Sequence, residues 1–151
     1  VDLEFNVNTV CANGRIIGGI GGGQDVAAGA ALTIIFLPLA TGKGEWGFPR
    51  VVEKVYTRTT PGEVIDVVVT EDFVAVNPRS KSPYKQNILD KAQDFGIKIL
   101  SIDELHLRSL EKAKQLGRIP PRQATTEEIV HAIEWRDGTL LDVIRRPLRK
   151  D

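Results

Sequence analysis

The sequence predicts an α/β fold: an open, mainly parallel sheet with helices on its faces and an antiparallel hairpin at the end of the chain. Three observations predict it. A continuous apolar run from Leu32 to Ala40 is typical of a strand covered on both faces in a parallel sheet. Helical and strand patterns alternate over residues 88–117. Apolar and polar residues then alternate on either side of the turn pair Asp137-Gly138.

Length and composition favour one soluble globular domain over residues 1–151. Hydrophobic residues make up 42% of the 151 and charged residues 26%, a balance that argues against disorder. The formal net charge of zero gives no overall attraction to nucleic acid or to an anionic membrane. The longest apolar stretch, Ala27–Ala40, is shorter than the roughly 20 residues of a membrane span. Cys11 is the single cysteine, so no internal disulfide is expected, and a cytoplasmic location follows.

The first elements expected are a strand and a hairpin. Val1, Leu3, Phe5 and Val7 alternate with polar residues, which predicts a half-buried strand. Because this pattern starts at the first residue and the chain has no methionine, we expect the C-terminal piece of a longer protein. An Asn-Gly turn pair then predicts a hairpin over residues 7–17.

The next elements are a glycine run, a short helix and several strands. Five of the six positions from 18 to 23 are glycine. Asp25 is a candidate N-cap for a helix over Val26–Ala31. After the apolar run at 32–40, three stretches rich in β-branched residues predict strands, at residues 51–60, 64–70 and 73–76.

The last third of the chain predicts a helix, a strand, a second helix and a hairpin. A helical pattern from Ile88 ends at Gly96, and a buried strand is expected over 97–102. Ser101 and Glu104 have the spacing of a capping box, which opens a helix that runs toward residue 117. Residues 118–126 contain Pro-Pro and predict a linker, and the hairpin follows over 129–144.

Three functions are open to the glycine run. A nucleotide phosphate loop is disfavoured because neither of its signatures fits: Gln24 stands where GxGxxG needs its last glycine, and Gly42-Lys43 lacks the rest of a GxxxxGK[ST] motif. The second is an oxyanion hole, in which backbone amides hold the developing charge on a thioester carbonyl oxygen. The third is structural, a tight turn with close packing of helix against sheet. His106 and His131 have no partners at metal-ligand spacing, so no metal site is expected.

Several blocks in order resemble the C-terminal part of the citrate lyase α subunit family. They are VDLEFNVN, GGIGGGQDVAAGAALTIIFLPL, GIKILSIDEL and HAIEWRDGTLLDVIRR, which together extend over nearly the whole chain. A more distant resemblance links residues 19–30 and Thr70-Glu71 to acetyl-CoA hydrolases and to acetate or butyrate CoA-transferases. The resemblance implies a CoA-transferase type of sheet, with the glycine run at the carboxyl end of the sheet, where ligands bind.

The resemblance also implies an activity and partners. The family exchanges acetyl for citrate on a phosphopantetheine-like or CoA thioester arm, which is a substrate and not a bound cofactor. The implied partners are the lyase (beta) subunit, the acyl carrier (gamma) subunit and the remainder of the same alpha subunit, in an oligomer. The 151 residues are therefore expected to be inactive alone. The alternatives are a related acetate or butyrate CoA-transferase or acetyl-CoA hydrolase, and a non-catalytic interaction domain.

Gly19, Gly21 and Gly22 match the glycine pattern of the family, and Asp25 matches the aspartate that follows it. Gly23 departs from that pattern, because citrate lyase α subunits usually carry histidine there and the hydrolase group glutamine. Glu71 and Arg50 are candidates because of their own positions: Glu71 stands where a predicted strand meets a loop, and Arg50 lies near a predicted strand. We expect Gly21 and Gly22 to position the thioester and its oxyanion, and we expect substrate or CoA contacts from Gly19, Gly23, Gln24, Asp25, Glu71 and Arg50.

Overall fold

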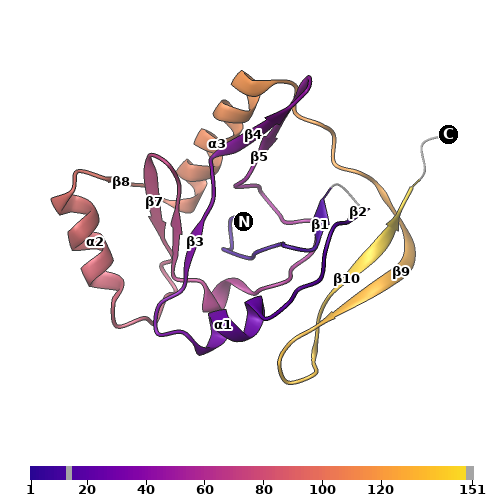
Figure 1. The fold of residues 1–151 in the computed structure, drawn as a ribbon, viewed down its shortest axis with the longest axis horizontal. Coiled ribbons are helices and arrows are strands. Elements are labelled where there is room, and N and C mark those ends of the chain that lie inside the picture. The colour runs from indigo at the N-terminus through magenta and orange to yellow at the C-terminus, as the bar shows by residue number, and fades with distance from the viewer. Residues whose placement is uncertain (13–14, 149–151) are drawn as a thin grey trace.

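The computed structural model describes residues 1–12 and 15–148, which form a mixed α/β fold (Figure 1). In chain order the elements are β1 (Cys11–Ala12), β2 (Arg15–Ile16), α1 (Gly23–Gly29), β3 (Ile34–Phe36), β4 (Ala40–Lys43), β5 (Trp46–Pro49), a 3-10 turn (Gly62–Val64), β6 (Val67–Val69), β7 (Phe73–Val76), α2 (Lys85–Asp94), β8 (Lys98–Ile99), α3 (Ile102–Leu116), β9 (Thr125–Glu134) and β10 (Leu140–Pro147).

The largest sheet has four strands in the order β3-β6-β7-β8. β3 pairs with β6 and β7 with β8 in parallel, whereas β6 and β7 are antiparallel. The short turn over residues 70–72 explains the antiparallel pair, because a parallel connection needs a crossover of a dozen or more residues. The pairs β1–β2, β4–β5 and β9–β10 are all antiparallel. An open, mainly parallel sheet is thus not confirmed: the sheet is mixed.

The predicted opening strand is wrong. Residues 1–7 pair only through isolated bridges, Asp2 with Val52 and Val7 with Thr60. The Asp2 carboxylate accepts hydrogen bonds from the backbone amides of Glu4 and Asn6, at 3.0 and 2.9 Å, and so closes a turn. The backbone at Phe5 then has a positive φ of 63°. Apolar alternation survives because Phe5 and Val7 are buried, but this backbone is not extended.

The apolar run at 32–40 also differs from its prediction. Only Ile34–Phe36 form a strand, β3, and this strand lies at the edge of the sheet. Its side chains are half-buried or exposed, so the strand is not covered on both faces by the described residues. Two other strand predictions fail. Residues 51–60 form no strand, only isolated bridges. In the 97–102 stretch only Lys98–Ile99 pair, and both are exposed.

The later elements are confirmed. α2 ends before Gly96, whose φ is +66°. α3 opens with the predicted capping box: the Ser101 hydroxyl accepts from the Glu104 amide, and the Glu104 carboxylate accepts from the Ser101 amide at 2.9 Å. These hydrogen bonds lower the pKa of Glu104. β9 and β10 form the terminal hairpin. The predicted linker over 118–126 holds only in part: Ile119–Ala124 have no regular structure, but Arg118 forms a bridge with Trp46, and β9 already begins at Thr125. The predicted Asn13-Gly14 turn lies outside the described residues, but its flanks pair as β1 and β2.

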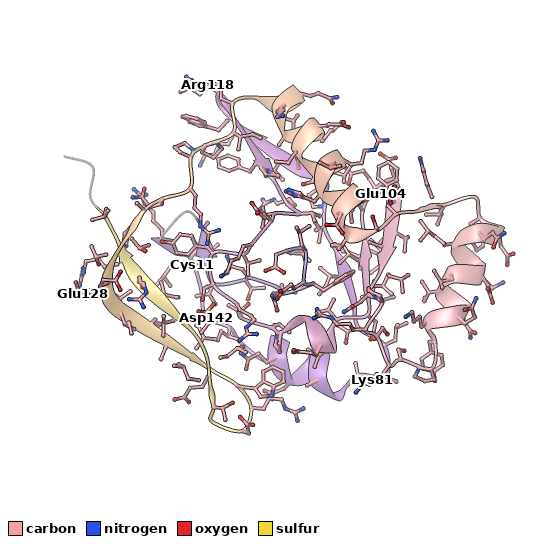
Figure 2. The ribbon with its side chains drawn as sticks, turned by 180° about the vertical axis from the view of Figure 1, so that it is seen from behind. Cys11, Lys81, Glu104, Arg118, Glu128 and Asp142 are labelled. Atoms are coloured by element: carbon pink, nitrogen blue, oxygen red, sulfur yellow. The ribbon has the colours of Figure 1, made fainter. Side chains whose placement is uncertain are left out.

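Two apolar clusters hold these elements together. The larger one lies between α3 and one face of the four-stranded sheet, and it includes Phe5, Val51, Val68 and Leu105. The smaller one lies under the C-terminal hairpin and joins Ile133 and Ile144 to Val10 and Cys11 of the first hairpin. Figure 2 shows Cys11 close to this hairpin. Among the described helices, none is long and apolar enough to cross a membrane.

Candidate functional site

The glycine run connects the first hairpin to α1. The amide of Ile17 donates to the Val10 carbonyl at 2.7 Å, and this hydrogen bond closes the hairpin just before the glycine run. α1 then begins at Gly23, with Gly22 as its N-cap. The run therefore leaves β2 and enters a helix directly.

The amides of the glycine run have no hydrogen-bond partner within the part of the chain that the structure describes. Between residues 18 and 23 no amide donates to another of the described residues. The Gly22 carbonyl does accept from the Val26 amide at 3.0 Å, as the first turn of the helix requires. These donors are therefore available to a ligand or to water.

The run also lies in open space. A Cβ added at Gly18, Gly19, Gly22 or Gly23 would meet nothing within 4 Å, and the same is true at Gly21. Close packing of helix against sheet therefore does not explain these glycines. A turn explains one of them, because Gly21 has a φ of +59°, which side chains rarely adopt.

Three neighbours fix the run in place. Ile20 packs against the smaller apolar cluster beneath the C-terminal hairpin. The buried Gln24 side chain donates to the Thr59 carbonyl at 2.7 Å. The Asp25 carboxylate lies 3.2 Å from the Arg136 guanidinium at the tip of the hairpin, in an exposed ion pair. Gln24 and Asp25, both predicted as substrate contacts, therefore have partners within the chain.

The predicted N-cap role of Asp25 is wrong. The N-cap is Gly22, which has no side chain to bond a helix amide, and Asp25 lies within the first turn. A carboxylate in the first turn still faces the positive end of the short helix dipole. Its closer partner is Arg136.

The glycine run lies at the amino end of β3, not at the carboxyl end that was expected. α1 leads into β3, and the Thr33 hydroxyl bonds back to the Ala27 carbonyl at 3.0 Å. The Thr33 amide donates to the carboxylate of Asp66, the residue just before β6. α1 thus meets the point where both parallel strands begin, and Figure 1 shows it below β3.

Glu71 and Arg50 lie at the other end of β3. The Glu71 carboxylate accepts from the Leu39 amide at 2.9 Å, and the Arg50 amide donates to the Leu39 carbonyl at 3.0 Å. Both residues are exposed and share Leu39 as a backbone neighbour. The structure therefore divides the predicted site residues into two groups: the glycine run with Gln24 and Asp25, and Glu71 with Arg50.

A cleft of about 430 Å³ was missed by the sequence analysis. It lies between the N-terminal turn, residues 54–58, the segment before β9, and β10, whose Asp142 is labelled in Figure 2. No local motif marks it, because its walls come from segments up to about 140 residues apart. The charged residues that line it are Asp2, Glu4, Lys54, Arg58, Arg122, Asp142 and Arg145.

The arginines of this cleft are already bonded within the chain. Arg58 donates to the Leu141 carbonyl at 2.8 Å, and its amide donates to the Asp142 carboxylate at 2.6 Å. Arg122 donates to two backbone carbonyls and lies over the Tyr56 ring, 5.5 Å from its centroid. These contacts hold the hairpin and the linker to the body, so the cleft is first of all a structural junction. No set of three or more His, Cys, Asp or Glu side chains suited to a metal occurs among residues 1–12 and 15–148.

Comparison with known proteins places this geometry in a family. Residues 1–147 match the sequence profile of "Citrate lyase, alpha subunit (CitF)". The chain belongs to the citrate lyase alpha subunit family. It is 40% identical over 152 aligned residues to the citrate lyase alpha chain of Klebsiella pneumoniae, covering 100% of this chain and 27% of that one. It is 33% identical to the Escherichia coli alpha chain, covering 97% of this chain and 26% of the relative.

A solved structure from the same family has a similar fold. It is described as an alpha subunit of citrate lyase from Streptococcus mutans in complex with citrate, with a TM-score of 0.79 and 37% identity. The match covers 99% of this chain and 27% of that one. These 151 residues thus span about a quarter of the length of the family members that they resemble.

Proposed function

We propose that this chain is part of an acyl transferase subunit, in which the glycine run helps to hold a thioester while acetyl is exchanged for citrate. One observation carries the proposal: in a chain of this family, the amides of residues 18–23 have no partner among the described residues and lie in open space. Free backbone donors without side chains suit an oxyanion.

The reaction sets the requirement for such donors. A citrate carboxylate oxygen adds to the acetyl thioester carbonyl, the C–S bond breaks, and a mixed anhydride forms while the carrier thiolate leaves. That thiolate then attacks the citryl carbonyl, which releases acetate and leaves citryl thioester. In both steps negative charge develops on a carbonyl oxygen. Two amides from Gly21 and Gly22 would stabilise that charge without any proton transfer.

Citrate is the acid we propose, because the Streptococcus mutans relative was solved in complex with citrate. Arg50 is exposed, and its guanidinium could pair with a citrate carboxylate. The Glu71 carboxylate, bonded to the Leu39 amide, would fix the backbone beside Arg50. The carrier would be a CoA or phosphopantetheine-like arm on the acyl carrier (gamma) subunit, and the lyase (beta) subunit would take the citryl product.

The two groups of residues lie at opposite ends of β3, so we propose that other parts of the alpha subunit complete the site. The family members are almost four times as long as this chain. Gly23 brings no side chain to the site where family members usually carry histidine. The thioester contacts proposed here are therefore backbone contacts.

The test is Gly22→Val in the intact alpha subunit. The φ of Gly22 is −86°, and a Cβ added there would meet nothing within 4 Å, so we expect the subunit to fold with valine at this position. We expect citryl thioester formation from acetyl carrier and citrate to fall at least about 100-fold, as when an oxyanion donor is blocked. Gly18→Val is the matched control, because Gly18 is equally open and is not one of the two glycines proposed to hold the oxyanion. Equal activity of the two folded variants would contradict the proposal.

The alternatives predict other products. A CoA-transferase that works through an enzyme glutamate would give a glutamyl-CoA adduct, which mass spectrometry detects after borohydride or hydroxylamine treatment. A hydrolase would release acetate without citrate. A non-catalytic interaction domain would show no dependence on Gly22 in any thioester assay.

A further inference from the structure

The four-stranded sheet has two apolar faces. On the first, Ile35, Val68 and Ala75 stand in register and belong to the larger apolar cluster. On the second, the register aligns Phe36, Val69, Val74 and Ile99 in one row across all four strands. Side chains alternate between faces along a strand, so this second row points away from the larger cluster.

The chain covers these faces unequally. α3 supplies Ile102 and Leu105 to the larger cluster and covers the first face. α2 packs against β7 and β8, which Figure 1 shows at the far end of the sheet from β3. Along the second row, Val74 in β7 is only 5% exposed and Ile99 in β8 is 39% exposed, whereas Phe36 in β3 is 74% exposed. The described residues therefore bury the second face at β7 but leave it exposed at β3.

The connection between β3 and β6 does not supply the missing layer. Parallel strands are usually joined by a helix that packs on the sheet. Here the connection over residues 37–66 contains the β4–β5 hairpin and a 3-10 turn but no α-helix. Its buried residues Leu39, Val51 and Ile65 belong to the larger cluster, on the first face.

The exposed strand has the sequence of a covered one. Residues 32–40 contain no charged residue, which is the composition of a strand buried on both faces. Thr33 and Leu37 bond to β6 through their backbones, so alternation directs the amides of Ile34 and Phe36 to the free edge. Natural edge strands are usually protected by charges or by a covering segment, and β3 has no charge.

We propose that an apolar helix face from a part of the alpha subunit outside these 151 residues packs over Phe36 on the second face of the sheet. Almost three quarters of the length of the family members lies outside this match, which provides the covering segment. A helix suits the surface because helices cover both faces of sheets with parallel pairs. The partner surface is therefore apolar and belongs to the same polypeptide.

Photocrosslinking in the intact alpha subunit tests this directly. Benzoylphenylalanine replaces Phe36 in one variant and Phe95 in a control, an aromatic residue of similar exposure (77%) at the end of α2. We expect position 36 to crosslink to a segment outside residues 1–151 of the same polypeptide, and position 95 to give no crosslink to that segment. Mixed isotope labelling separates crosslinks within one chain from those between copies.

Two results would overturn the proposal. One is a folded subunit in which position 36 gives no crosslink; the other is a crosslink to a second copy or to another subunit. A stability measurement supports the distinction: Phe36→Ser should lower the Tm of the intact subunit by several degrees, whereas Phe95→Ser should leave it nearly unchanged. Equal Tm values for Phe36→Ser and the unmodified subunit would also count against a buried Phe36.

Discussion

At the scale of single residues, Gly21 differs from the other glycines of its run. Its φ of +59° is a conformation that residues with a Cβ adopt at a cost of about 1 to 2 kcal/mol. Space is not the constraint, because no atom lies within 4 Å of an added Cβ. Any loss of stability at this position would therefore report the backbone alone.

We expect Gly21→Ala to lower the free energy of unfolding by about 1 kcal/mol. Urea denaturation followed by circular dichroism measures it. Gly18→Ala is the control, since this glycine has equal space and no positive φ, and its change should stay within about 0.5 kcal/mol. If both variants lose the same free energy, the φ at Gly21 is not what selects glycine.

Residue-scale prediction from sequence worked where the signal was local. The three-residue spacing of Ser101 and Glu104 predicts that each caps the backbone amide of the other, and the structure has both of these hydrogen bonds. The N-cap prediction for Asp25 failed because its partner is not local. Asp25 stands before a helical pattern, but the helix already starts at Gly23. The Asp25 carboxylate pairs with Arg136, which lies 111 positions further along the chain. A partner so distant leaves no trace in the local pattern.

At the scale of elements, the β4–β5 hairpin packs against α3 through a glycine. A Cβ on Gly47 would lie 1.9 Å from the Ala113 carbonyl oxygen of the helix, so backbone meets backbone there. Gly42 is the register partner of Gly47 across the hairpin, but a Cβ there would lie 3.5 Å from Leu116, an ordinary contact. Position 47 therefore has no room for a Cβ, whereas position 42 has.

Gly47→Ala should separate the hairpin from α3 and cost about 3 kcal/mol of unfolding free energy, because neither backbone can move without losing its own hydrogen bonds. Gly42→Ala should be nearly neutral. Chemical denaturation of both variants tests the difference. Similar midpoints for the two would mean that the helix and the hairpin approach less closely than described.

Element predictions succeeded for α2, α3 and the terminal hairpin, whose periodicity and end signals agree. The prediction of an opening strand failed because a side chain, and not a neighbouring strand, accepts the backbone hydrogen bonds there. Asp2 accepts the amides of Glu4 and Asn6, and its other carboxylate oxygen accepts the Val55 amide at 3.2 Å. Alternating apolar residues cannot distinguish that turn from a strand, because both bury Phe5 and Val7.

At the scale of the whole molecule, the C-terminal hairpin is a separate layer held by its own apolar cluster. Ile133 and Ile144 are each 1% exposed and pack against Cys11, and Ile20 of the glycine run lies against the same cluster. The wide separation of these residues in sequence explains why neither this cluster nor the neighbouring cleft could be predicted. Because Ile20 packs on this cluster, the C-terminal hairpin supports the glycine run.

Cys11 makes the docking of this hairpin measurable. Its thiol is buried, and burial raises its pKa, so the native chain should react slowly with thiol reagents. Ile144→Ala removes buried contacts worth about 2 to 5 kcal/mol and weakens the docking of the hairpin. Local opening then exposes Cys11 more often than global unfolding does.

We expect Ile144→Ala to speed the modification of Cys11 by at least about tenfold, since 1.4 kcal/mol of docking energy already gives that factor. Leu140→Ala is the control in the same hairpin, where the side chain is exposed, and it should leave the rate unchanged. Cysteines elsewhere in the alpha subunit are replaced beforehand so that only Cys11 reports. If Ile144→Ala leaves the rate as it was while the subunit stays folded, the hairpin does not seal Cys11, and the glycine run does not depend on this layer for support.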